Sequence, residues 1–253
     1  MTPSGAFAVL ADVHGNVWAL REVLADIRRR GIRSIFNLGD SVYGVLAPAA
    51  TADLLMDDGI RSLRGNQDRI VFAPTPESAA SADHRHVFAE LRREHFEWFA
   101  AQSVRLAERG ALFCHGTPDS DETYLLETVT PQGARLATDA EILARLGATE
   151  ERLIACGHSH VPRLVRLSDG RTVLNPGSVG MPAYAEDEPF PHVMEAGSPH
   201  ARYAIVTPSC GDWDIELVAL RYPWIEAGAA ARANGRHDRA RWIESGRATE
   251  KPA

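Results

Sequence analysis

Lysine is almost absent from this sequence of 253 residues: every one of its 27 basic residues except Lys251 is an arginine. A P-loop needs a lysine after its glycines, a protein kinase needs one on a strand, and Schiff-base enzymes need one in a pocket. A lysine in the last three residues is poorly placed for any of these tasks. The sequence therefore argues against three common kinds of phosphate and carbonyl chemistry.

Cysteine and long apolar runs are also scarce. Cys114, Cys156 and Cys210 lack C-x-x-C spacing and are odd in number, so we interpret them as small buried apolar residues rather than disulfide partners or zinc ligands. No stretch approaches the ~18 apolar residues of a membrane span, and the first eleven residues do not have the pattern of a signal peptide. We therefore expect a cytoplasmic protein with no membrane contact.

The charge balance is acidic, with 34 Asp and Glu residues and a net charge of −7. This balance argues against a protein that coats nucleic acid or an anionic membrane, although a local field can still attract an anionic substrate. The ten histidines are the positive feature, because together with the carboxylates they supply many metal ligands.

Hydrophobic periodicity predicts a β-α-β-α-β start and hence a largely parallel sheet. Helical spacing connects Val17, Leu20 and Val23, with Asn16 as the N-cap and Gly31 as the stop. The expected elements here are strands at 6–11, 34–38 and 60–63, helices at 17–27 and 48–56, and a long aromatic helix at 86–102.

The second half has a β-rich pattern. We expect a hairpin of strands 104–107 and 111–114, a helix at 133–146, and strands at 152–156, 163–166, 172–174, 202–207 and 214–220. The acidic, Pro-containing segment 186–199 is predicted to be an exposed loop that could act as a lid. The last thirty residues, rich in Arg and Ala, are predicted to form two short surface helices.

Metal-competent residues follow five of the predicted strands. They occur as Asp12-x-His14, Gly39-Asp40, Gly65-Asn66-x-Asp68, His115-Gly116 and Gly157-His158-x-His160. Ligands collect at the carboxyl ends of strands in α/β sheets, so these segments can converge. On an extended chain, residues i and i+2 point the same way, which would direct each D-x-H or H-x-H pair into one site.

The donor set comprises two carboxylates, four imidazoles and one amide oxygen. It suits divalent Mn, Fe, Zn or Ni, and the ligand types alone do not choose among them. Seven donors are too many for one tetrahedral ion and fit two ions, particularly if one carboxylate bridges them.

These motifs, followed by Asn175-Pro-Gly-Ser178, resemble those of the calcineurin-like metallophosphoesterase superfamily, in particular its small prokaryotic phosphodiesterases. The resemblance implies a four-layer αββα sandwich of two mixed sheets, with a core at 6–220 and a helical extension at 221–253 in a single domain, 1–253. It also implies two divalent metal ions, for which we favour Mn, and a supporting role for the Asn-Pro-Gly-Ser segment. By motif, Asp12, His14 and His160 would hold one ion, Asn66, His115 and His158 the other, and Asp40 would bridge them.

Two ions held ~3.5–4 Å apart would lower the pKa of a shared water and provide hydroxide near neutral pH. The hydroxide would attack phosphorus in line while the ions neutralise charge on the phosphoryl oxygens. We assign the catalytic roles to Asp40, Asn66 and His115.

One position departs from the family pattern. Family members that cleave monoesters well commonly have a histidine after the Gly-Asn pair, where it protonates the leaving group, but this chain has Gln67. General acid catalysis is worth roughly 10²–10⁴-fold, so its loss favours substrates with good leaving groups. Phosphodiesters and phosphoanhydrides fit this requirement, with dinucleoside polyphosphates as candidate substrates.

Further substrate contacts are predicted for Asn16, Tyr43 and Gln67. His84, His86 and His192 are considered as replacement acids, although we interpret each as a surface residue.

The alternatives are a phosphomonoesterase or protein phosphatase on the same site, and a non-catalytic metal-binding scaffold. A nuclease is disfavoured by the acidic balance, and Gly157-His158-Ser159-His160-Val161 breaks the G-x-S-x-G pattern of a serine hydrolase. The expected partner is a small phosphate ester, and a homodimer is the default assembly.

Overall fold

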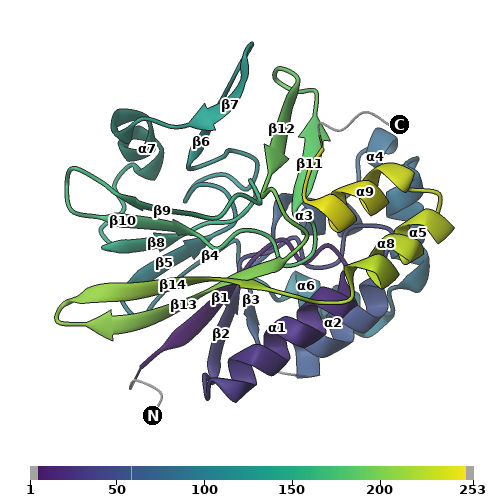
Figure 1. The fold of residues 1–253 in the computed structure, drawn as a ribbon, viewed down its shortest axis with the longest axis horizontal. Coiled ribbons are helices and arrows are strands. Elements are labelled where there is room, and N and C mark those ends of the chain that lie inside the picture. Colours follow the sequence, from purple (N-terminus) through teal and green to yellow (C-terminus); the bar gives the residue numbers. More distant parts are fainter. Residues whose placement is uncertain (1–4, 58, 249–253) are drawn as a thin grey trace.

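Two five-stranded mixed sheets form the centre of the computed structural model, which describes residues 5–57 and 59–248 (Figure 1). The first sheet has the order β14-β13-β1-β2-β3. Its strands β1, β2 and β3 run parallel, whereas β13 pairs antiparallel with both β1 and β14. The bounds are β1 Phe7–Leu10, β2 Ser34–Asn37, β3 Arg61–Ser62, β13 Ala201–Ser209 and β14 Asp212–Leu220.

The second sheet has the order β4-β5-β8-β10-β9. Its central strands β5, β8 and β10 are parallel, and an antiparallel strand lies at each edge. The bounds are β4 Arg105–Glu108, β5 Ala111–Cys114, β8 Leu153–Ala155, β9 Arg163–Arg166 and β10 Thr172–Asn175. Each sheet thus has three parallel strands whose carboxyl ends can carry a site, as the sequence pattern predicted.

An apolar layer joins the two sheets. Phe7 and Phe36 from the first sheet contact Phe113 from the second, with ring centroids 5.8 Å and 4.1 Å away, respectively. These side chains are almost completely buried, together with Val9, Leu38 and Leu174. Because strand residues alternate between faces, the same strands also supply a second, outward apolar face for helices.

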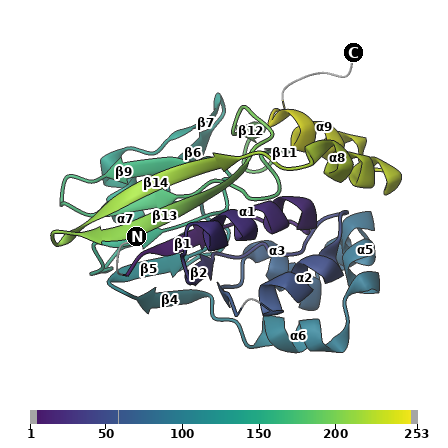
Figure 2. The ribbon, with the colours of Figure 1, turned by 60° about the horizontal axis from the view of Figure 1, so that its bottom comes forward.

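Helices cover both outer faces, which confirms the predicted four-layer arrangement (Figure 2). On the first sheet, Leu10 packs with Leu20 and Leu24 of α1 (Val17–Arg29) and with residues of α2 (Pro48–Asp57) and α8 (Trp224–Ala233). On the second sheet, Ile154 packs with Ile142 of α7 (Asp139–Leu146). The Asn16 side chain accepts a hydrogen bond from the Ala19 N–H, which confirms the predicted N-cap of α1.

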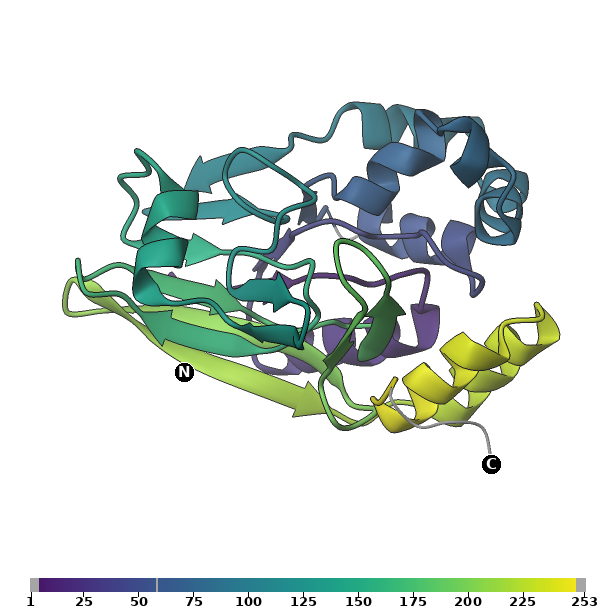
Figure 3. The same ribbon diagram turned by 90° about the horizontal axis from the view of Figure 1, so that it is seen from above.

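Additional helices and two hairpins surround the carboxyl ends of the parallel strands (Figure 3). The helices are α3 Asn66–Phe72, α4 Pro76–Ala79, α5 Ala82–Glu90, α6 Arg93–Ala100 and α9 His237–Ser245. The hairpins are β6 Glu127–Thr130 with β7 Gly133–Leu136, and β11 Ala183–Glu186 with β12 His192–Glu195. Helix α9 lies against both α8 and β11.

Three predicted elements were wrong. The helix expected at 86–102 is two helices, because Leu91 is extended with ψ 140° and the His95 ring accepts from the Arg92 N–H to start α6. The helix expected at 133–146 begins only after Thr138, whose capping box with Glu141 fixes the start of α7, and its first part is strand β7. The loop expected at 186–199 contains strand β12, with Met194 buried.

The two C-terminal helices are present as α8 and α9, and Ala240 and Ile243 bury one face of α9. Lys251 lies outside the described residues. Cys114 and Cys156 are buried as predicted, but the prediction for Cys210 was wrong, because it lies exposed in the turn between β13 and β14. Within the part of the chain that the structure describes, no helix has the length and apolar character needed to cross a membrane.

Candidate metal centre

Five of the predicted metal ligands have left-handed backbone conformations. Their φ angles lie between +50° and +68°, in a region that non-glycine residues rarely adopt; they are Asp12, His14, Asp40, His158 and His160. The extended-chain argument for the i and i+2 pairs is therefore wrong, since these residues leave the strands in tight turns. Strained backbone of this kind persists where the surrounding structure holds it, and it concentrates at functional sites.

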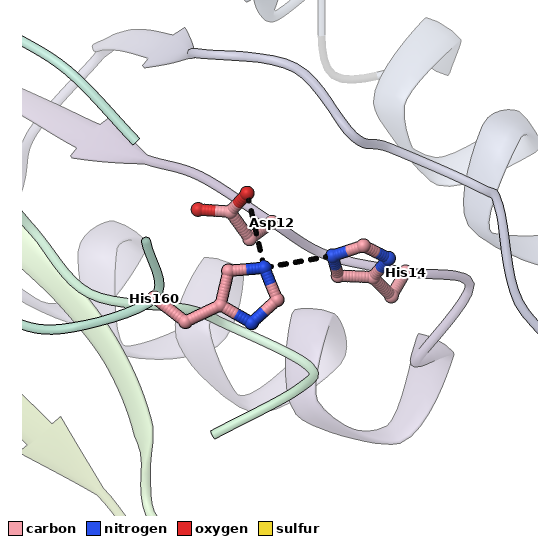
Figure 4. Close-up of side chains that lie close together, drawn as sticks. All are labelled: Asp12, His14 and His160. Carbon is pink, nitrogen blue, oxygen red and sulfur yellow. Dashed lines mark hydrogen bonds and ion pairs between the residues drawn. The ribbon is translucent and has the colours of Figure 1, made fainter. Parts of the chain in front are cut away.

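The first donor cluster comprises Asp12 and His14 after β1 and His160 after β8 (Figure 4). One ligand atom from each residue lies within 4.8 Å of the other two, and all three side chains are buried. The Nε2 atoms of His14 and His160 are 3.1 Å apart, and His160 Nε2 is 3.4 Å from an Asp12 oxygen. Three potential ligand atoms therefore converge on one point.

Backbone carbonyls orient these histidine rings. His14 Nδ1 lies 2.9 Å from the Tyr43 carbonyl and His160 Nδ1 lies 2.6 Å from the Met181 carbonyl. When Nδ1 of a neutral ring donates to a carbonyl, the lone pair is on Nε2. Two such lone pairs facing each other are repulsive until a cation or a proton lies between them, so this cluster fits a metal ion.

The second cluster comprises Asp40 after β2, His115 after β5 and His158 after β8. His115 Nδ1 is 3.0 Å from the Leu38 carbonyl, and its Nε2 is 3.0 Å from Oδ1 of Asn66. His158 uses the opposite nitrogen for support, because its Nε2 is 3.0 Å from the Glu122 carbonyl. Its Nδ1 is therefore the atom free to bind a cation.

Asp40 lies between the two clusters. Its Oδ2 is 3.5 Å from His115 Nε2 and 3.9 Å from His14 Nε2, and its Oδ1 accepts from the Gln67 N–H. The carboxylate is almost fully buried, so only protein groups or bound ions can balance its charge.

The protonation states also fit cation binding. Burial and the neighbouring His160 lower the pKa of His14 to about 4, and burial together with His115 lowers the pKa of His158 to about 4. Both rings are thus neutral ligands at pH 7. Burial opposes ionisation of Asp40, but His115 outweighs it and lowers the pKa of Asp40 below its ordinary value. Despite its own burial, His115 has a pKa raised to about 10 by Asp40, so an imidazolium balances the buried carboxylate when no metal does.

Close backbone packing holds the donors in place. A Cβ on Gly65 would lie 2.2 Å from Asp40 Oδ1, so only glycine allows α3 to begin beside this carboxylate. The Asn175 amide donates to the Gly157 carbonyl, and the Ser178 hydroxyl donates to the Asp12 carbonyl, both from buried positions. The supporting role expected for the Asn-Pro-Gly-Ser segment requires hydrogen bonds of this kind to the loops that carry the donors.

A cavity of about 190 Å³ opens over both clusters. Residues around it come from α3, the loop before β6, β11 and α9. Its lining includes the donors His14, Asp40, Asn66, His158 and His160, together with Gln67, Tyr124, Tyr184, Arg236, Arg239 and Trp242.

Gln67, for which a substrate contact is predicted, borders this cavity, and its Oε1 is buried without a hydrogen-bond partner in the described residues. Asn16 does not border it: the residue is fully buried, and its amide nitrogen lies 2.9 Å from the Gly180 carbonyl and 3.2 Å from the Tyr222 hydroxyl. The substrate contact predicted for the Asn16 side chain therefore has no support in this geometry.

Tyr43 also lies away from the cavity lining, in an apolar cluster with its hydroxyl 3.3 Å from Ser81 Oγ. His84 and His192 are buried rather than on the surface: His84 lies 3.3 Å from the Val71 carbonyl and His192 lies 3.3 Å from the Tyr124 hydroxyl. Neither borders the cavity.

Sequence reasoning missed the cavity residues that come from outside the motifs. Tyr124 stacks on His158 with ring centroids 4.6 Å apart, and the Tyr184 hydroxyl lies 2.7 Å from the Tyr124 hydroxyl. Arg236 and Arg239 approach from α9, where the Arg-rich composition was the only signal.

The fold and its donor clusters place this chain in the class of metal-dependent phosphoric ester hydrolases. The model of the calcineurin-like phosphoesterase superfamily domain matches residues 6–194. The chain therefore belongs to this superfamily, in agreement with the resemblance carried by its motifs.

Three relatives extend over most of this chain. An uncharacterized protein from Methanocaldococcus jannaschii is 26% identical, with 85% of this chain and 87% of that protein covered. The crystal structure of a metallophosphoesterase from Sphaerobacter thermophilus superposes with a TM-score of 0.72 at 22% identity, covering 93% and 97% of the two chains. A hypothetical protein from Pyrococcus horikoshii superposes with a TM-score of 0.74 at 16% identity, covering 96% and 98%. These structures share the fold of this chain.

Proposed function

We propose that this chain hydrolyses phosphodiester or phosphoanhydride bonds with good leaving groups, using two divalent metal ions. The observation that carries the proposal is the position of Asp40 between two buried donor clusters beside one cavity. Asp12, His14 and His160 would hold one ion, Asn66, His115 and His158 the other, with Asp40 shared. Manganese is our first choice, within a donor set that also suits Fe, Zn and Ni.

The bound ions would activate water and neutralise charge on the phosphoryl group. In the overall reaction, the water oxygen forms a bond to phosphorus, the bond from phosphorus to the leaving oxygen breaks, and that oxygen keeps the electron pair. The water proton is released to solvent when the leaving group is a weak base. No covalent intermediate on the chain is required.

Gln67 supports the preference for good leaving groups. It borders the cavity next to Asn66, and its amide can donate a hydrogen bond but cannot transfer a proton near neutral pH. An alkyl monoester needs its leaving oxygen protonated, whereas an aryl or nucleotide leaving group does not. Dinucleoside polyphosphates fit this requirement.

The test is reconstitution of metal-stripped protein with Mn, Ni, Zn or Mg, one metal at a time. We expect two ions per chain by elemental analysis, and faster hydrolysis of bis(p-nitrophenyl) phosphate than of p-nitrophenyl phosphate. Asp40→Asn should abolish hydrolysis and lower the metal content. Asp119→Asn is the matched control, because Asp119 is exposed and contacts Arg105 outside the site.

Two results would overturn the proposal. Predominant monoester hydrolysis would indicate a phosphomonoesterase or protein phosphatase on the same site. Absence of bound metal together with absence of hydrolysis would indicate a non-catalytic scaffold.

A further inference from the structure

Helix α9 brings two arginines to the cavity that contains the metal donors. Arg236 precedes the helix and Arg239 lies in its first turn, and both border the same 190 Å³ cavity as His14 and Asp40. The helix packs against β11 at the rim of the site (Figures 1 and 3). It also lies beyond residues 6–194, the part of the chain that matches the superfamily model.

One buried carboxylate holds both guanidinium groups. Asp83 of α5 pairs through Oδ1 with Arg236 and through Oδ2 with Nη2 of Arg239, the latter at 2.5 Å. Arg236 is also paired with Asp238 at 2.7 Å. The two arginines are thus fixed in orientation by α5 and α9 before any ligand binds, which lowers the entropic cost of binding.

Arg239 keeps hydrogen-bonding capacity that the protein does not use. A guanidinium has five N–H donors, yet the Nε of Arg239 is buried with no hydrogen-bond partner in the described residues. The side chain is 14% exposed, so bulk water has little access to it. That Nε is closed to the cavity, whereas the Nη1 group of the same guanidinium has no hydrogen bond in the described residues and is not among the buried atoms that lack one. Because Arg239 borders the cavity, Nη1 is the donor that an anionic oxygen there can reach.

The cavity volume limits where such an anion can lie. A space of about 190 Å³ is small for a ligand pocket, and both the metal donors and the arginines border it. A group bound to Arg239 would therefore be close to the phosphoryl group at the metal site, within the same substrate molecule. A planar guanidinium fork recognises phosphate oxygens well, and this geometry favours Arg over Lys.

We propose that Arg239, held by Asp83 beside Arg236, forms an anion subsite for the phosphate next to the scissile phosphorus. The inference rests on the proposed function and narrows its substrate class to phosphoanhydrides, such as nucleoside diphosphate esters and dinucleoside polyphosphates. A diester with a single phosphate would occupy the metal site but make no contact with Arg239.

The test compares two substrates that share one leaving group, the p-nitrophenyl ester of AMP and the β-p-nitrophenyl ester of ADP. We expect the wild-type ratio of kcat/KM to favour the ADP ester, and Arg239→Gln to reduce that ratio by about 10- to 100-fold, the effect of losing a charged hydrogen bond. Arg241→Gln is the matched control, because Arg241 lies on the same helix with its side chain exposed. Arg239→Lys keeps the charge next to Asp83, so its kcat/KM ratio should lie between those of Arg241→Gln and Arg239→Gln. This variant shows the effect if Arg239→Gln is unstable.

A second measurement does not depend on hydrolysis. Metal-stripped protein is titrated with tripolyphosphate by calorimetry, and we expect Arg239→Gln, but not Arg241→Gln, to weaken binding at least tenfold. If Arg239→Gln leaves both the ester ratio and tripolyphosphate binding as in the control, the subsite is refuted while the proposed hydrolysis stands. If no ester is hydrolysed with any metal, the proposed function fails, and the titration alone decides whether the subsite exists.

Discussion

Replacing Ser178 by alanine should destabilise the site without touching any proposed ligand. The hydroxyl of Ser178 donates to the Asp12 carbonyl and accepts from the Met181 N–H, each at 2.7 Å, and the residue is fully buried. The carbonyl of Met181 in turn accepts from His160. One hydroxyl therefore links the backbone of Asp12 to that of Met181, whose carbonyl supports the His160 ring.

The expected cost follows from the groups left behind. In Ser178→Ala the Met181 N–H would be buried without an acceptor, whereas the Asp12 carbonyl keeps a bond from the Gly180 N–H at 3.1 Å. One unpaired buried donor and one lost hydrogen bond together cost about 2–4 kcal/mol. For a chain of this length, that corresponds to a fall in Tm of roughly 5–15 °C. Looser support of Asp12 and His160 should also weaken metal binding about 10- to 100-fold.

The assay is urea unfolding and thermal melting of metal-free protein, followed by metal titration of the folded variant. Thr51→Val is the matched control, because Thr51 is equally buried but its hydroxyl has no partner in the described residues. Removing that hydroxyl should leave the free energy of unfolding unchanged or raise it. Both variants lose one buried hydroxyl, but only in Ser178→Ala does that loss remove hydrogen bonds.

The reasoning would be refuted if Ser178→Ala lowered the unfolding free energy no more than Thr51→Val. A loss of stability with unchanged metal affinity would show that the Asn-Pro-Gly-Ser segment supports the fold alone and not the donors.

Two further predictions concern ionisation at the site. Gln67→His should restore a general acid and raise the ratio of monoester to diester hydrolysis at least tenfold. The ratio is measured with p-nitrophenyl phosphate and bis(p-nitrophenyl) phosphate. An unchanged ratio would contradict the assigned role of Gln67. The pKa of His115 is raised to about 10 in metal-free protein, so a metal ion that binds there must displace the His115 proton. The apparent metal affinity of the second cluster should therefore rise up to tenfold per pH unit between pH 7 and 9. The same shift means that metal-free protein loses stability as pH rises from about 6.5 through 10, which pH-dependent melting would detect. Metal affinity that does not change over this range would rule out a protonated His115.

Local sequence was sufficient to predict the candidate donors and much of the scaffold. Asp12, Asp40 and His115 each follow a short buried strand. Both the residue type and its position at the end of a strand can be read from that one segment of sequence. The carboxyl ends of parallel strands lie at the same edge of a sheet, so residues that follow these strands are brought close together. Helix α1 was equally accessible, since Asn16 and the apolar spacing after it are local signals.

Two other predictions from local sequence were wrong because contacts with other segments set the backbone conformation. The apolar spacing across 86–102 continues through Leu91, but the backbone there turns extended and a new helix starts at Arg93. The donors converge through left-handed turns rather than extended chain. At Asp12 and His14 these turns depend on hydrogen bonds that their N–H groups donate to the carbonyls of Gly39 and Asp40. A strained φ is stable only when distant backbone holds it.

The sequence by itself determined which donor atoms the candidate metal centre has available, because their number and kind follow directly from residue identities. Only the tertiary structure decided what else faces the substrate. It buried Asn16 under its own hydrogen bonds, and it brought Arg236 and Arg239 to Asp83 across 153 and 156 positions of chain. The composition of the last helix could not show this, since an arginine on a helix has the same local pattern whether it faces water or a cavity.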